Sequence, residues 1–174
     1  MTDQQIKYVR EFYPFALASQ KETGISAIAQ MAQGAEESAW GTVCPGNMIF
    51  GVKDTDGVNG NEQLLVTTEY SKNANAPFPN IISKTPVLRN GQKYFKYKIK
   101  DYFRKYASPK ESFVDHCKFF ISNPRYKQAL IVKSDPYKFI DEIAKAGYAT
   151  GPGYADELKS IAHSIEKIIQ TLKL

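Results

Sequence analysis

Hydrophobic residues recur at helical spacing in both end regions of the chain and at a spacing of two in its middle. A first helix is predicted from Thr2 or Asp3 to about Lys21, with Gly24 as its stop. A second is predicted from Ile25 to Ala39. Later helices are expected from Ser108 to Ser122, over 124–133, from Ser134 or Asp135 to Gly147, and from Tyr154 to Leu172. Ser108 and Glu111 have the spacing of a capping box.

Residues 54–107 have no helical spacing and are rich in Gly, Asn and Pro. Strands are predicted from Glu62 to Tyr70 and on either side of Asn90-Gly91, because this pair favours the tight turn of a hairpin. We therefore predict an α+β, mainly α fold in a single domain over 1–174. It has a helical lobe of residues 1–53 and 108–174, and a small antiparallel β-lobe over about 54–107.

The stretch from Gln92 to Tyr106 alternates aromatic or aliphatic residues with Lys and Arg. Three interpretations fit this pattern. It can be a two-sided sheet with aromatic residues inward and lysines outward, protecting an edge. It can bind a glycan strand, or single-stranded nucleic acid. No recognised nucleic-acid motif accompanies it, so nucleic acid is not expected as a partner.

The composition is that of a soluble globular protein, with 43% hydrophobic and 24% charged residues and a net charge of +5. No apolar run is long enough to span a membrane. The first residues have neither the basic nor the apolar region of a signal peptide. We therefore expect a cytosolic protein or one exported by another route.

The second predicted helix carries the first chemical signal. One side of it presents Gln30, Gln33, Gly34 and Glu37, a surface suited to a polar substrate. Glu36 and Glu37 stand at its C-terminal end, where the helix dipole disfavours negative charge. With Trp40 to exclude water, such a carboxyl should have a raised pKa and can act as a general acid. The alternative is that both are solvated charges.

The segment AQGAEESAWG, followed by PGNMIFGVK, resembles the signature of glycoside hydrolase family 73, which contains peptidoglycan-cleaving β-N-acetylglucosaminidases. The matching residues are Ala32, Gln33, Glu37, Ser38, Trp40, Gly41, Asn47, Phe50, Gly51 and Lys53. Gly34 and Ala39 depart from the pattern, standing where alanine and glycine are usual. The resemblance implies a lysozyme-like bundle with the β-lobe flanking a cleft and Glu37 as general acid. It also implies substrate-binding roles for Gln33, Trp40, Asn47 and Phe50.

Other segments extend the resemblance. Glu69, in TTEY, matches a second acidic residue on the β-lobe, although it can also be an outward strand charge. NPRY at 123–126 and AGYATGPGY match further family elements, with Gly151 replacing an aspartate. They place Tyr148 in the cleft, holding the acetamido group or the attacking water, with Tyr126 and Tyr154 among the substrate-binding residues. The alternative for Tyr148 is a packed core residue.

The resemblance implies an endo-β-N-acetylglucosaminidase that cuts peptidoglycan in the bacterial envelope, as a secretion-system effector with an immunity protein or as a phage lysin. A muramidase, a lytic transglycosylase and a non-catalytic wall-binding module are the alternatives. No cofactor is expected, and His116 and His163 are too scattered for a zinc site. Cys44 and Cys117 can form a disulfide or stay thiols, and a Cys-His nucleophile pair is conceivable.

Overall fold

The computed structural model describes residues 1–149 and 153–174, which form two compact units. The helical unit comprises Met1–Gly51 and Tyr106–Leu174, and the β unit comprises Val52–Lys105. The described residues contain six α-helices and one antiparallel sheet of three strands. The predicted α+β, mainly α class is therefore confirmed.

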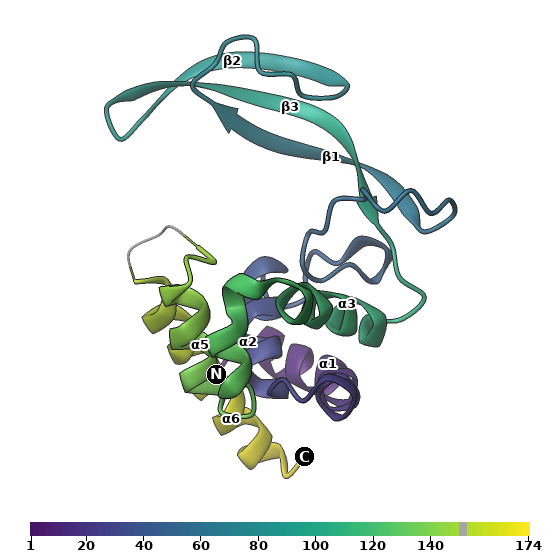
Figure 1. Ribbon diagram of the computed structural model, residues 1–174, viewed down its shortest axis with the longest axis vertical. Coiled ribbons are helices and arrows are strands. Elements are labelled where there is room, and N and C mark those ends of the chain that lie inside the picture. Colours follow the sequence, from purple (N-terminus) through teal and green to yellow (C-terminus); the bar gives the residue numbers. More distant parts are fainter. Residues whose placement is uncertain (150–152) are drawn as a thin grey trace. The chain divides into compact units, whose positions relative to one another are not determined.

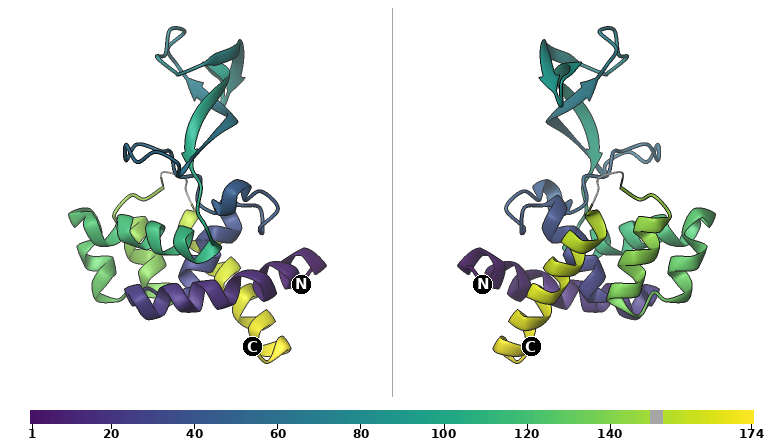
Figure 2. Two further views of the ribbon diagram at one scale, coloured as in Figure 1. Left: turned by 90° about the vertical axis from the view of Figure 1, so that its right-hand side faces the viewer. Right: turned by 90° about the vertical axis from the view of Figure 1, so that its left-hand side faces the viewer.

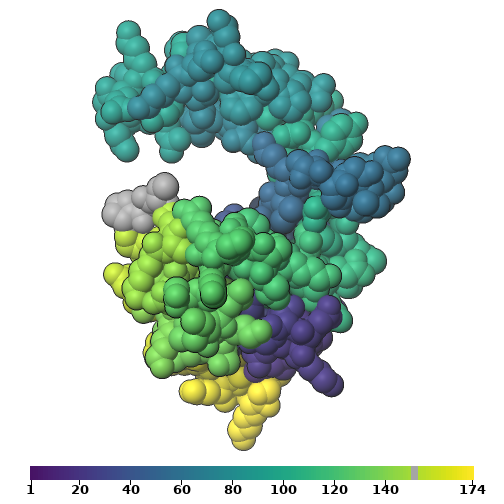
Figure 3. Space-filling model, viewed as in Figure 1, coloured from purple at the N-terminus to yellow at the C-terminus, as the bar shows by residue number. Residues whose placement is uncertain are grey.

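The helical unit is built around α2 (Ala27–Glu37). This helix contacts α1 (Asp3–Thr23), α5 (Pro136–Lys145) and α6 (Tyr154–Leu172), while α3 (Pro109–Ser122) packs on α1 (Figures 1 and 2). A short α4 (Lys127–Ile131) and the 3-10 turns η1 (Pro45–Asn47) and η2 (Pro124–Tyr126) complete the unit. In the space-filling view, the green side chains of α3 to α5 form a continuous surface (Figure 3).

Capping residues set both ends of α1 and the start of α5. Thr2 and Gln5 form a capping box at the start of α1, and Gly24 ends that helix with a left-handed φ of 76°. Asp135 accepts hydrogen bonds from two backbone N–H groups of α5. The capping box predicted at Ser108 is wrong: the Ser108 side chain makes no capping bond, and the Glu111 carboxylate accepts from the N–H of Ala107 at 3.0 Å instead.

The prediction of an open polar face on α2 is also wrong. Gln30 and Gln33 are each only 1% exposed, because α2 is surrounded by other helices of its unit. Their amides are used inside the protein: Gln30 Nε2 donates to the carbonyl of Ile25 at 2.7 Å, and Gln33 Nε2 donates to the hydroxyl of Tyr154 at 3.4 Å. Buried amides need partners, and the bond from Gln33 links α2 to α6.

The β unit contains β1 (Glu62–Ser71), β2 (Ile81–Arg89) and β3 (Gln92–Arg104), with β3 in the middle (Figure 1). Asn90 and Gly91 both have positive φ, as the predicted hairpin turn requires. On one face Tyr97 and Ile99 are buried in a small core with Ala76. The alternating lysines of β3 point the other way and are exposed, on the central strand and not on an edge.

No helix in the part of the chain that the structure describes is long and apolar enough to cross a membrane.

Candidate active site

Glu37 is the last residue of α2, with Ser38 as the C-cap. Its side chain reaches solvent, yet the protein atoms crowded around its carboxyl displace enough water to raise its pKa. The negative charge of Glu36 raises it further. The pKa of Glu36 is itself raised by partial burial and by Glu157. The direction of the shift at Glu37 is the one expected of a general acid.

The chain turns sharply after Glu37. Ala39, Trp40 and Gly41 all have left-handed φ values, of 50°, 57° and 75°. Left-handed backbone costs a residue with a Cβ about 1–2 kcal/mol, so the turn needs support. Ser38 supplies it, since its buried hydroxyl donates to the carbonyl of Gly34 at 2.5 Å and accepts from the N–H of Gly41 at 2.9 Å. The sequence motif includes Ser38 but does not indicate this supporting role.

Trp40 and Gly41 seat the turn against α1. The Trp40 ring meets Tyr8 edge to face at 5.7 Å, and Gln4 Nε2 donates to the Trp40 carbonyl at 2.6 Å. A Cβ on Gly41 would lie 2.8 Å from the ring of Phe12 and 2.9 Å from that of Tyr8. These contacts, together with the left-handed φ, explain why glycine stands here.

Asn47 and Phe50 lie in the loop that follows. Asn47 has a φ of 58°, and its side-chain amide donates to the carbonyl of Tyr106 at 2.9 Å. Phe50 is 8% exposed and stacks on His116 with ring centroids 3.9 Å apart and planes 6° from parallel. Phe50 therefore anchors the loop on α3 as a buried ring.

Three tyrosines, Tyr126, Tyr148 and Tyr154, form a cluster of rings. Tyr148 stacks on Tyr154 at 5.9 Å and meets Tyr126 at 6.3 Å. Burial is the main cause of a raised pKa for Tyr148 and Tyr154, and the negative charges of Glu36 and Glu37 contribute to both. The tyrosine cluster thus lies within electrostatic reach of the acidic end of α2.

His116 was considered from sequence only as a zinc ligand or a partner for a thiol. It is 5% exposed, and its Nε2 lies 3.0 Å from the hydroxyl of Tyr148. Burial lowers its pKa to about 3, so the ring is neutral at ordinary pH. His116 therefore connects Phe50 to Tyr148. The signal in the sequence was its position on the apolar side of α3.

Glu69 belongs to the β unit and is paired there. Lys53 Nζ lies 3.2 Å from a carboxylate oxygen of Glu69 and 2.9 Å from one of Asp101. These two carboxylates, Asp101 first, raise the pKa of Lys53. Lys53 is the last residue of the motif that contains Phe50, so the motif continues into the surroundings of Glu69.

Cys44 and Cys117 are free thiols. Cys117 lies 3.7 Å from the hydroxyl of Ser19, and burial raises the pKa of its thiol to about 11, which opposes a nucleophilic role. No group of three metal-ligating side chains occurs in residues 1–149 and 153–174. Gly151 lies outside the described residues.

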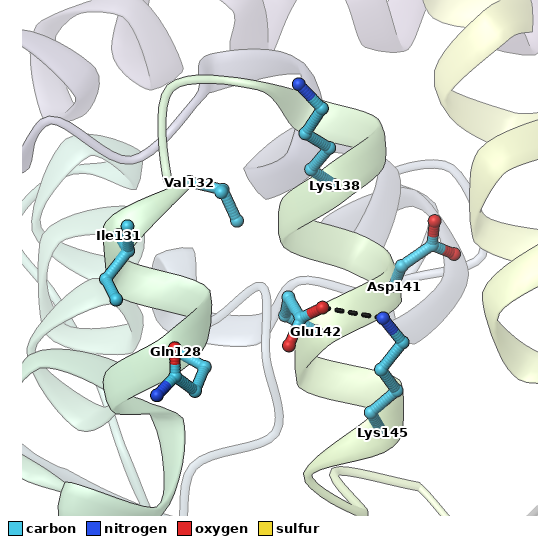
Figure 4. A pocket seen from close by; sticks show the side chains of 7 residues that line it. All are labelled: Gln128, Ile131, Val132, Lys138, Asp141, Glu142 and Lys145. Atoms are coloured by element: carbon cyan, nitrogen blue, oxygen red, sulfur yellow. Dashed lines mark hydrogen bonds and ion pairs between the residues drawn. The ribbon is translucent and has the colours of Figure 1, made fainter.

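A depression on the helical unit lies between α4 and α5 (Figure 4). Its lining includes Asp141 and the ion pair between Lys145 and Glu142 at 2.6 Å. None of the predicted site residues lines it, so it is not the candidate active site.

Comparison with known proteins shows which family the chain belongs to. The glucosaminidase family, described as mannosyl-glycoprotein endo-beta-N-acetylglucosaminidase, matches residues 13–167. Peptidoglycan hydrolase FlgJ of Vibrio cholerae is 30% identical over 172 residues, 95% of this chain and 45% of that protein. The chain spans about half the length of the curated relatives it matches.

The solved structures agree. A truncated glycoside hydrolase domain of Salmonella typhimurium FlgJ has a TM-score of 0.70 and 26% identity, over 94% of this chain and 98% of that one. The structure of a type VI secretion system effector-immunity complex from Pseudomonas protegens shows the same fold more distantly, with a TM-score of 0.55 and 16% identity over 97% of this chain and 96% of that one. The lysozyme-like fold implied by the sequence is confirmed, and the chain belongs to the glucosaminidase family of glycoside hydrolases.

Proposed function

We propose that this chain is an endo-β-N-acetylglucosaminidase that cleaves the β-1,4 bond between N-acetylglucosamine and N-acetylmuramic acid in peptidoglycan, with Glu37 as general acid. One observation carries the proposal: in a chain of the glucosaminidase family, the motif carboxyl ends α2 in surroundings that raise its pKa. The names of the FlgJ relatives support peptidoglycan as the substrate.

In this mechanism the protonated Glu37 donates its proton to the glycosidic oxygen as the bond breaks. Desolvation and the charge of Glu36 keep the proton on the carboxyl to a higher pH than in water. Glu36 acts as an electrostatic neighbour and not as a second acid. The left-handed turn after Glu37, fastened by Ser38, holds the acid in one place.

The tyrosine cluster binds the sugar in this proposal. The Tyr148 hydroxyl holds the acetamido group or the attacking water, and His116 fixes that hydroxyl. Tyr154 is held from behind by Gln33. His116 thus positions Tyr148, and Gln33 positions Tyr154. The buried Gln33 therefore has an indirect part in substrate binding.

The remaining motif residues support the site in different ways. Trp40 and Asn47 fix the loop that follows the acid, and their exposed edges contact the glycan. Buried Phe50 keeps His116 in place beneath Tyr148. Tyr126, 2% exposed, packs at the side of Tyr148 and shapes the sugar-binding surface from within.

Glu69 is the proposed second carboxylate. Three routes are open to the family chemistry: a base that activates water, a nucleophile, or a residue that orients the substrate's own acetamido group. Lys53 holds the Glu69 carboxylate in an ion pair, an arrangement that suits a base or an orienting group. We favour these two roles over that of the nucleophile, since a paired carboxylate is less free to attack.

The bond that is cleaved can be identified directly. Purified peptidoglycan is digested with the chain, the products are reduced with borohydride, and the new ends are identified by mass spectrometry. Reduced N-acetylglucosamine ends are expected. Reduced muramic ends would show a muramidase, anhydro-muramic ends a lytic transglycosylase, and no new ends a wall-binding module. The Glu37→Gln chain is the control for contaminating hydrolases.

The likeness in fold to a type VI effector-immunity structure supports a role as an injected antibacterial enzyme, acting in the envelope of another cell and inhibited by an immunity protein. A phage lysin is the alternative setting. Expression of the chain in the periplasm of a test bacterium, compared with expression in its cytoplasm, tests this. Lysis only after periplasmic expression is expected, and equal growth in both cases would contradict it.

A further inference from the structure

The net positive charge of the chain is confined to the β unit. Val52–Lys105 contains 10 basic and 5 acidic residues, whereas the helical unit contains 13 of each. The β unit therefore carries all of the net charge of +5, on less than a third of the chain. Such a distribution gives one unit a field that attracts anions.

Three lysines of β3 lie on one face of the sheet, and the acidic residues Glu69 and Asp101 lie on the other. Lys96, Lys98 and Lys100 alternate along the central strand β3 and are exposed. The register pairs them with Tyr70, Thr68 and Val66 of β1, and Thr85 and Ser83 of β2 pair with Lys96 and Lys98. We call this surface the open face. Glu69 and Asp101 lie on the opposite face, where Glu69 pairs with the buried Tyr97.

The three lysines are close enough to repel one another. Alternate residues of a strand are separated by about 6.6–6.8 Å, which is within the screening length of about 8 Å at physiological salt. None of the three makes an ion pair with another described residue. A polyanion would therefore find unneutralised charge on the open face and would relieve the repulsion.

Two of the aromatic rings on the open face are covered by cations, whereas a third, Tyr102, is 49% exposed. The Arg89 guanidinium lies 4.2 Å from the centre of the Tyr70 ring, and Lys72 Nζ lies 5.5 Å from that of Tyr94. Base stacking needs free ring faces. The open face is therefore suited to a polymer recognised by its charge, and less suited to nucleic acid.

We propose that the open face of the β unit binds the free carboxylates of the peptide stems of peptidoglycan. This inference rests on the proposed function for the identity of the polymer. Lysine ammonium groups in a row suit carboxylates spread along a wall strand, because each acts as a point charge without fixed geometry. The face lies opposite Glu69, so it holds the wall by contacts separate from that carboxylate.

The test is binding of the inactive Glu37→Gln chain to purified peptidoglycan sacculi, measured by co-sedimentation. In this background, the triple variant Lys96→Gln, Lys98→Gln and Lys100→Gln should bind about tenfold more weakly, at a small cost per exposed pair. The matched control changes the exposed Lys118, Lys127 and Lys173 of the helical unit to Gln and should stay within twofold. Equal thermal unfolding of the two triple variants shows that neither has lost its fold.

A second arm changes the polymer. Sacculi whose carboxylates have been amidated should bind the unaltered Glu37→Gln chain about as weakly as native sacculi bind the β3 triple variant. Equal binding of native and amidated sacculi, or unchanged binding of the β3 triple variant, would overturn the proposal. Tighter binding to single-stranded DNA than to sacculi at the same ionic strength would assign the face to nucleic acid instead.

The two proposals fail separately. Binding is measured with an inactive chain. Muramic product ends in the digestion experiment would therefore contradict the proposed bond specificity but leave the wall-binding proposal intact. Loss of the binding result would leave the bond specificity intact.

Discussion

Gly34 tests whether the helix that carries the acid is packed as described. The family usually has alanine here, and Gly34 lies inside α2 at an ordinary helical position. An added Cβ would lie 2.7 Å from the Tyr8 hydroxyl and 2.9 Å from Cγ2 of the buried Ile49. Alanine gains about 1 kcal/mol of helix propensity, but overpacking of this kind costs about 1–3 kcal/mol.

We therefore expect Gly34→Ala to destabilise the chain by about 1 kcal/mol, a fall in Tm of about 2–4 °C. The assay is urea unfolding of four chains: wild type, Gly34→Ala, Tyr8→Phe and the double variant. Tyr8→Phe removes the nearer contact and loses a hydrogen bond to the Met31 carbonyl worth about 1 kcal/mol.

In the Tyr8→Phe background the close contact with Ile49 remains, so Gly34→Ala should still cost stability but less than in the wild type, a coupling of about 1 kcal/mol between the two sites. Stabilisation by Gly34→Ala alone, or an equal cost in both backgrounds, would refute this account of why alanine is absent.

Three further predictions concern the chemistry. Because Glu37 works as a protonated acid with a raised pKa, the rate should fall as pH rises through that pKa; Glu36→Gln removes a like charge and should move this fall to lower pH in a rate–pH profile. His116→Phe should lower kcat in the wild type but add little in a Tyr148→Phe background, and additive losses in this cycle would show a merely structural histidine. Glu69→Gln should lower the rate less than Glu37→Gln does, and an unchanged rate would remove Glu69 from the mechanism.

The helices and the hairpin were predictable because their signals are local. Gly24 ends α1, Asp135 caps α5, and Asn90-Gly91 forms the hairpin turn. Each does so through its own backbone or side-chain chemistry. Helix α6 has the bounds that its apolar spacing predicts, from Tyr154 to Leu172.

The errors arose where tertiary packing overrides a local pattern. The amides of Gln30 and Gln33 are polar in sequence but buried, because other helices enclose α2. Gln33 finds its partner on α6, and Gln30 finds its partner at Ile25, just before α2. Ser108 and Glu111 have capping-box spacing, but the Glu111 carboxylate bonds to Ala107.

The link from Phe50 through His116 to Tyr148 joins three segments far apart in the chain, so periodicity within any one of them could not reveal it. Two separate sequence motifs indicated Phe50 and Tyr148, without indicating that they are connected. Only the fold shows that a neutral histidine lies between them.

The most direct test of the central claim compares Glu37→Gln with Glu36→Gln on purified peptidoglycan. The two changes are chemically identical, lie on adjacent residues and differ only in which carboxyl loses its proton. After equal folding is shown by thermal unfolding, the account predicts that Glu37→Gln loses a factor of roughly 100 or more in rate while Glu36→Gln stays within a few fold. Loss of activity in Glu36→Gln with activity kept in Glu37→Gln would contradict the assignment of Glu37 as the general acid.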